Sequence, residues 1–230
     1  MKSIFFDAGP IISLAMNNLL WLLQELKKVY PGDFYISQAV KKEVIDKPFS
    51  GKRFKFEAMQ VMSVVESKVL EVNYDKKIEK ISQKLMDVAN KCFMAKGNYI
   101  QIVHMGEIET LAGAIVFGSE LVVIDERTTR LLIENPNGLL ELLQHKLHMP
   151  IKMVKENIAE FSRLTKNIRI SRSVELAVIA YEKGILDRLL PQVANPKKEL
   201  LDGVLWGIKL NGCSVSRREI EQILKIETKK

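Results

Sequence analysis

Two short apolar segments, each followed at once by an aspartate, place the strongest constraint on how this 230-residue chain folds. The segment SIFF precedes Asp7, and the segment LVVI precedes Asp125. Both have the length of strands that are buried on both faces, and segments with helical periodicity lie between them. Short buried strands that alternate with helices predict an α/β fold with a mostly parallel central sheet of four or five strands and helices on both faces.

Turn residues and apolar periodicity divide the first part of the chain into further elements. Gly and Pro residues mark the breaks, and Ser37 is well placed to cap a helix. The predicted elements are a helix at 11–28, a strand at 34–36, a helix from Ser37 through Val44, a strand at 69–72, a helix at 76–95 and a helix at 107–117 with Gly118 at its C-cap.

Beyond residue 135 the pattern becomes mainly helical. Helices are predicted at 139–147, 154–165, 173–183, 197–210 and 216–226, the last with a capping box formed by Ser216 and Glu219. Short strands at 151–154 or 168–170 would extend the sheet, and the sequence does not decide between strand and helix there. We therefore predict an α/β core over residues 1–135, and a basic, mainly helical C-terminal region over residues 136–230 that packs on the core or extends it.

The charge of the chain is unevenly distributed. The formal net charge is +7, and residues 151–230 hold 16 Lys and Arg residues against 10 Asp and Glu residues. A basic region is consistent with contact to a phosphate backbone, although basic proteins without nucleic-acid partners are common. The cysteines, Cys92 and Cys213, lie far apart and indicate neither a disulfide framework nor a zinc site. No apolar run is long enough to span a membrane, so a cytoplasmic protein is expected.

Acids that directly follow buried strands are candidates for function. Ligands of parallel α/β sheets bind at the carboxyl ends of the strands, so two neighbouring strands would hold Asp7 and Asp125 within reach of one cation. Oxygen-rich sites that lack imidazole suit Mg²⁺ or Mn²⁺. Either aspartate alone is also consistent with a capping role in a turn or helix. His104 is interpreted as an ordinary loop histidine.

Three motifs occur in an order that is typical of one family. They are FFDAGPIISLA near the start, ISQAVKKEVI in the second strand-helix unit, and GEIETLAGAIVFGSELVVIDERTTR around the third. Together they resemble the PIN-domain ribonucleases over residues 1–130. The segment from SVELAVIAYEKG to the final helix resembles, more loosely, the helical tail of one prokaryotic PIN branch. Residues 138–170 are longer than the usual connection in that branch.

The resemblance implies both an activity and a site. It implies a nuclease core in which Asp7, Glu43, Glu107 and Asp125 bind Mg²⁺ or Mn²⁺, while Glu126 adds a ligand or caps the next helix. The implied reaction is endonucleolytic hydrolysis of RNA by a metal-activated water, in a toxin or an RNA-processing enzyme. A toxin would be paired with an antitoxin or other protein partner, and a homodimer is a further expectation.

Glu107 and Glu109 cannot both point into one site, because two helical positions differ by about 200°. The resemblance and the nearness of the helix N-terminus favour Glu107 as the ligand. Candidate nucleic-acid contacts are Arg53, Lys55, Lys197, Lys198, Arg217 and Arg218. Two alternatives stay open: a PIN-like module that binds RNA or protein with little or no catalysis, and a metal-dependent phosphatase acting on small molecules.

Overall fold

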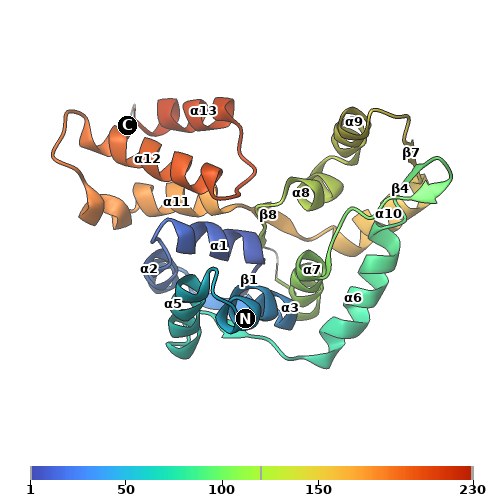
Figure 1. Ribbon diagram of the computed structural model, residues 1–230, viewed down its shortest axis with the longest axis horizontal. Coiled ribbons are helices and arrows are strands. Elements are labelled where there is room, and N and C mark those ends of the chain that lie inside the picture. Colours follow the sequence, from blue (N-terminus) through green and yellow to red (C-terminus); the bar gives the residue numbers. More distant parts are fainter. Residues whose placement is uncertain (1, 120, 229–230) are drawn as a thin grey trace.

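The computed structural model describes residues 2–119 and 121–228. Its central sheet has the strand order β3-β2-β1-β6-β8, and every pair of neighbours is parallel. These strands are β1 (Lys2–Phe6), β2 (Gly32–Ile36), β3 (Glu71–Val72), β6 (Leu121–Val123) and β8 (Arg169–Ser171). Helices pack on both faces of the sheet (Figure 1), so the predicted fold class is confirmed.

The two segments that the sequence left undecided both form strands, but in different sheets. Residues 169–171 form β8, which pairs with β6 and completes the central sheet from outside residues 1–135. Residues 152–153 form β7, which pairs with β4 in a small antiparallel sheet. That sheet consists of β4 (Phe93–Ala95), β5 (Asn98–Tyr99) and β7 (Lys152–Met153). The C-terminal region is therefore part of the central sheet as well as a helical extension.

Most of the predicted helices are present, and two further helices, Lys55–Glu66 and Arg127–Glu134, were not predicted. The helices are α1 (Ala8–Met16), α2 (Trp21–Val29), α3 (Gln38–Lys41), the π-helical turn η1 (Lys42–Asp46), α4 (Lys47–Ser50), α5 (Lys55–Glu66), α6 (Lys76–Ala89), α7 (Met105–Phe117), α8 (Arg127–Glu134), α9 (Pro136–Leu147), α10 (Lys155–Thr165), α11 (Ser173–Glu182), the 3₁₀ turn η2 (Ile185–Leu189), α12 (Pro196–Leu210) and α13 (Arg217–Glu227).

Two predicted helices were too long, and each is shortened by asparagines. The helix predicted over 11–28 is broken between α1 and α2, where Asn17 ends α1 and Asn18 takes a left-handed backbone with φ of 54°. Asn tolerates that conformation better than most residues. The helix predicted over 76–95 ends at Ala89, because the Asn90 side chain binds the backbone N–H of Ile102 at 2.8 Å and the chain then enters β4.

Alternate residues of β1 supply two separate cores, one on each face of the sheet. Ile4 and Phe6 are buried against α1, α2 and the C-terminal helices α11–α13, whereas Phe5 is buried against α6–α10. The Phe5 ring lies where a side chain at Gly113 would have to sit, since a Cβ there would be 2.3 Å from the ring. Glycine at this position therefore allows α7 to lie directly on β1.

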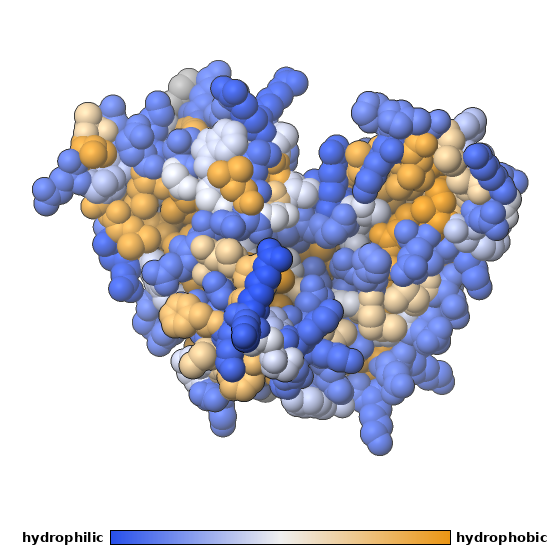
Figure 2. All heavy atoms as spheres, in the orientation of Figure 1, coloured by the Kyte–Doolittle hydropathy of each residue, from blue (hydrophilic) through white to orange (hydrophobic). Residues whose placement is uncertain are grey.

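The C-terminal helices are distributed over both faces of the sheet. Helices α9 and α10 pack into the Phe5 core, and α11–α13 pack into the other core. Figure 2 shows the surface hollowed between these two groups of helices, at the top of the view. Within residues 2–119 and 121–228, no helix combines the length and apolar character that a bilayer span requires.

Candidate metal centre

Asp7 and Asp125 follow neighbouring strands at the carboxyl edge of the central sheet. Strands β1 and β6 are hydrogen-bonded neighbours, and the Asp7 backbone N–H extends the pairing by donating to the Val123 carbonyl at 2.9 Å. From β1 the chain first builds β2 and β3 on one side, and then returns to build β6 on the other side. Ligands of open α/β sheets bind at such a reversal of strand order.

Asp7 is buried and caps α1. Its carboxylate accepts a hydrogen bond from the Gly9 N–H at 3.4 Å, and the residue is only 6% exposed. Burial, together with the negative charges of Glu107 and Glu43, raises the pKa of Asp7 to about 8, although hydrogen bonds from Ala8 and Gly9 oppose the shift. Asp7 is therefore a carboxylate whose ionised form needs a positive partner.

Glu43 reaches the same place from the π-helical turn η1. A Cβ built on Gly106 would lie 3.5 Å from both an Asp7 carboxylate oxygen and a Glu43 carboxylate oxygen. Loss of hydration, followed by the charge of Glu107, raises the pKa of Glu43, while Lys47 and His104 lower it. Because Gly106 has no side chain, open space is left between the carboxylates of Asp7 and Glu43. The negative charge of Glu107 repels both of these carboxylates.

Glu107 and Glu109 diverge in the way that the helical phase predicts. Glu107 lies in the first turn of α7, where its carboxylate accepts from the backbone N–H of His104 at 2.9 Å and lines a pocket with Asp7. The Glu109 carboxylate instead accepts from the Ala39 N–H at 2.9 Å, at the start of α3. Glu109 is outside the set of residues that line this pocket.

Asp125 is held by two serines from distant parts of the chain. One carboxylate oxygen accepts from the Ser173 N–H at 2.7 Å, and the other accepts from the hydroxyls of Ser173 at 2.6 Å and Ser13 at 2.9 Å. Glu126 caps α8, because its carboxylate accepts from the Thr129 N–H at 2.7 Å. Each of these carboxylates is thus already oriented by donors of the chain.

All five predicted acids line one pocket of about 310 Å³. Its other walls are formed by Ala8, Gly9, Ile12, His104, Gly106 and Gly212. In the described part of the chain, however, no three His, Cys, Asp or Glu side chains have converged into a group that would hold a metal ion. The carboxylates of Glu107 and Glu126 turn back toward the N-termini of their own helices, where each accepts a backbone hydrogen bond.

Comparison with known families assigns the fold. The family model described as a PIN domain matches residues 3–181, which is more than half of the chain. The chain belongs to the PIN-domain family. Searches of curated proteins and of solved structures gave no match. PIN domains are generally nucleases and typically use divalent metal ions, so this chain has a nuclease-type fold.

The side chains of this PIN domain fit a hard divalent cation. The pocket offers carboxylate oxygens with one histidine at its wall, and no ion pair of Asp7 with a Lys, Arg or His side chain is found among the described residues. Magnesium keeps several of its waters and needs only one or two carboxylates from the protein. Asp7 and Glu43, which face the space beside Gly106, would hold such an ion together with Glu107 and Asp125, which line the same pocket.

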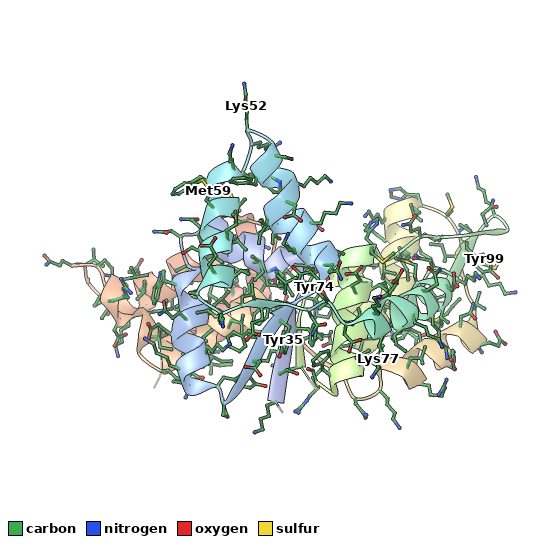
Figure 3. The ribbon with its side chains drawn as sticks, turned by 90° about the horizontal axis from the view of Figure 1, so that it is seen from below. Tyr35, Lys52, Met59, Tyr74, Lys77 and Tyr99 are labelled. Carbon is green, nitrogen blue, oxygen red and sulfur yellow. The ribbon has the colours of Figure 1, made fainter. Side chains whose placement is uncertain are left out.

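The predicted nucleic-acid contacts are not all near this pocket. Arg53 and Lys55 flank the start of α5, in the turn whose tip carries Lys52 (Figure 3). Arg217 and Arg218 begin α13, a few residues after Gly212 of the pocket wall.

Lys197 and Lys198 lie at the opposite end of α12 from the pocket. They are exposed in the first turn of this 15-residue helix, which spans roughly 20 Å. The loop that carries Gly212 follows the other end of the helix. The sequence placed all three basic pairs in one class, and only the fold separates them by distance.

Sequence reasoning missed the residues that hold Asp125. Ser13 lies one turn and a half into α1, and Ser173 is the first residue of α11, so neither is near Asp125 in the sequence. Gly9 belongs to the same surroundings, since a Cβ there would be 3.2 Å from the Asp125 Cβ. A serine that starts a helix directly after a strand of the same sheet was the one available signal for Ser173.

Proposed function

We propose that this PIN domain is a divalent-metal-dependent endoribonuclease that hydrolyses RNA phosphodiester bonds with Mg²⁺ or Mn²⁺. The observation that carries the proposal is the pocket at the carboxyl edge of the sheet, which five acids from four separate segments line together. A buried carboxylate flanked by two further acids is unfavourable in isolation and favourable around a cation.

In this proposal, the residues that line the pocket have separate roles. A bound divalent ion would supply positive charge to the phosphate oxygens and lower the pKa of the attacking water. Asp7, Glu43, Glu107 and Asp125 would hold the ion, and the α1 N-terminus fixes the Asp7 carboxylate. Asp125 is kept in one rotamer by its serine donors. His104 borders the pocket and would be placed to contact a phosphate oxygen.

The turn before α5 supports single-stranded RNA as the substrate. Arg53 lies 4.6 Å from the centre of the Phe54 ring, and Lys55 lies 5.0 Å from the centre of the Phe49 ring, while both rings stay partly exposed. Phe54 also lines an apolar groove with Ile12 and Glu43, residues that line the acidic pocket as well. Aromatic rings beside cations bind unpaired bases and their phosphates.

The pairs Arg53/Lys55 and Arg217/Arg218 are better placed to contact RNA than the pair Lys197/Lys198. Replacing both Arg53 and Lys55 with Gln should flatten the salt dependence of RNA affinity, because fewer counterions would be released on binding. The same change at Lys197 and Lys198 should have little effect, since they lie roughly 20 Å along α12 from the pocket. Equal effects of both double variants would place the RNA path elsewhere.

The proposal is tested by cleavage of single-stranded RNA in Mn²⁺ or Mg²⁺. Asp7→Asn should abolish cleavage, whereas Asp87→Asn, an exposed acid on α6, should leave the rate unchanged. Excess chelator should stop the wild-type reaction. Cleavage that persists in Asp7→Asn, or in chelator, would refute the mechanism.

A second candidate, a PIN-like module that binds RNA or protein with little catalysis, has one observation in its favour. Glu107, Asp125 and Glu126 are already engaged by donors of the chain and do not converge on one point. Salt-sensitive RNA binding without metal-dependent cleavage would select this candidate. An antitoxin or other protein partner and a homodimer stay predictions, which light scattering of the chain alone and with a candidate partner would test.

A further inference from the structure

The loop between α12 and α13 forms one wall of the acidic pocket, although it lies outside the segment that matches the PIN family. The match ends at residue 181, whereas Gly212 of this loop lines the pocket together with Asp125. The C-terminal helices would be expected to form an appendage if they had no role at the site. Their contacts with the site are instead direct.

One hydrogen bond joins this loop to the segment that carries Asp125, and a second contact joins it to Ser13 of α1. The Ser214 N–H donates to the Asp125 carbonyl at 3.1 Å. The Ser13 hydroxyl, which donates to the Asp125 carboxylate at 2.9 Å, also lies 3.3 Å from the Asn211 carbonyl. The loop therefore contacts both the backbone of Asp125 and the serine that orients its side chain.

Arg172 joins the loop to the other serine. It is only 8% exposed, and it directly precedes Ser173, whose N–H and hydroxyl both bind the Asp125 carboxylate. The Arg172 guanidinium donates to the Ser214 carbonyl at 3.0 Å and to the Glu219 carboxylate of α13 at 2.9 Å. A buried arginine with carboxylate and carbonyl partners holds a fixed geometry, because its planar donors leave little freedom.

We propose that the C-terminal helices α12 and α13 position Asp125 for metal binding, with Ser13 and Ser173 as positioning residues and Arg172 as the link from the helices to Ser173. The metal ion in this inference rests on the proposed function, whereas the link between the C-terminal helices and Asp125 rests on the hydrogen bonds alone. Carboxylates that bind metals are commonly oriented by further hydrogen bonds, and loss of such a partner costs about 10–100-fold in metal affinity or activity.

The first test removes one donor from Asp125. Ser173→Ala keeps the backbone N–H donor and deletes the hydroxyl, so we expect Mn²⁺ affinity, measured calorimetrically without RNA, to fall by about 10-fold. Ser173→Thr keeps a hydroxyl and should recover most of that affinity. With RNA, the rate at saturating substrate should fall in Ser173→Ala while KM changes little.

The second test uses two glutamates of α13 with matched chemistry. Glu219 pairs with the buried Arg172, whereas Glu221 pairs at 2.8 Å with the exposed Arg217. Glu219→Gln retains the capping box of α13, since Gln serves in that position. It should speed amide hydrogen exchange at Ser173 and Ser214 in the metal-free chain and weaken Mn²⁺ binding several-fold. Glu221→Gln should change neither.

The outcomes separate this inference from the proposed function. A wild-type chain that binds no Mn²⁺ would refute the proposed metal centre, while hydrogen exchange would still decide whether α13 holds the Asp125 segment. Wild-type Mn²⁺ affinity in Ser173→Ala would overturn the positioning role. Unchanged exchange at Ser214 in Glu219→Gln, or equal changes in Glu221→Gln, would overturn the link through Arg172.

Discussion

Removing the charge of Asp7 should stabilise the metal-free chain, and the gain should grow with pH. The pKa of Asp7 is raised to about 8 in the folded chain from an ordinary value of 3.8, because burial and two acidic neighbours disfavour its ionised form. Between these two values the folded state binds a proton that the unfolded state releases. The contribution of Asp7 to stability is therefore most favourable below pH 4 and is lost progressively as the pH rises toward 8.

The size of the effect follows from proton linkage. Each pH unit within this window removes at most about 1.4 kcal/mol from the free energy of unfolding, which gives an upper limit of roughly 5 kcal/mol by pH 8. The pocket is open to water through its exposed walls, and hydration of the ionised carboxylate reduces the loss, so we expect on the order of 2 kcal/mol. Asn at position 7 still caps α1, because Asn is as good an N-cap as Asp.

The assay is urea unfolding of wild type and Asp7→Asn in chelator at pH 5 and pH 8. Asp7→Asn should be close to wild type at pH 5 and clearly more stable at pH 8, whereas Asp87→Asn, an exposed acid, should show no such difference. Added Mn²⁺ should stabilise the wild type at pH 8 and should have little effect on Asp7→Asn. Equal stability of the two chains at pH 8, or an unchanged pH slope in the variant, would refute the reasoning.

Three further predictions concern the neighbouring elements. Glu107→Gln should lower the cleavage rate at saturating RNA by on the order of 10² or more, as loss of a metal ligand does, while Glu109→Gln changes it several-fold at most; rates in the reverse order would contradict the helix phase. Phe54→Gly should weaken binding of single-stranded RNA in fluorescence anisotropy, because it removes the partly exposed ring beside Arg53; unchanged affinity would exclude a base contact. Gly113→Ala should destabilise the fold by on the order of 2 kcal/mol in a thermal melt, because the new methyl would overlap the Phe5 ring, and a neutral result would show that α7 can move away from β1.

Local patterns in the sequence were sufficient for several elements of the fold. The apolar runs before Asp7 and Asp125 became neighbouring parallel strands, and Gly118 takes the left-handed C-cap of α7 with φ of 64°. The capping box of Ser216 and Glu219 starts α13 as predicted. These features depend on residues that are close in the sequence or on burial along one strand, so periodicity and turn chemistry determine them.

Local sequence patterns did not predict which sheet each short strand joins. Residues 152–153 and 169–171 are both short, and nothing in either segment specifies which sheet it joins. The π-helical turn that carries Glu43 was likewise not foreseen, because its geometry depends on packing of η1 against α1 and α5 rather than on propensity. Propensity is a weak guide wherever tertiary contacts compete with it.

For the site, the sequence supplied the acids and the tertiary structure supplied their surroundings. Asp7 and Asp125 were predictable because strand ends meet at one edge of a parallel sheet. The hydrogen bonds that orient Asp125 come from Ser13 and Ser173, which are 112 and 48 residues away in the chain, and the wall at Gly212 comes from a loop still farther along. No local pattern connects such residues, because only the packing of α1, α11 and α12 against the sheet brings their donors to one carboxylate.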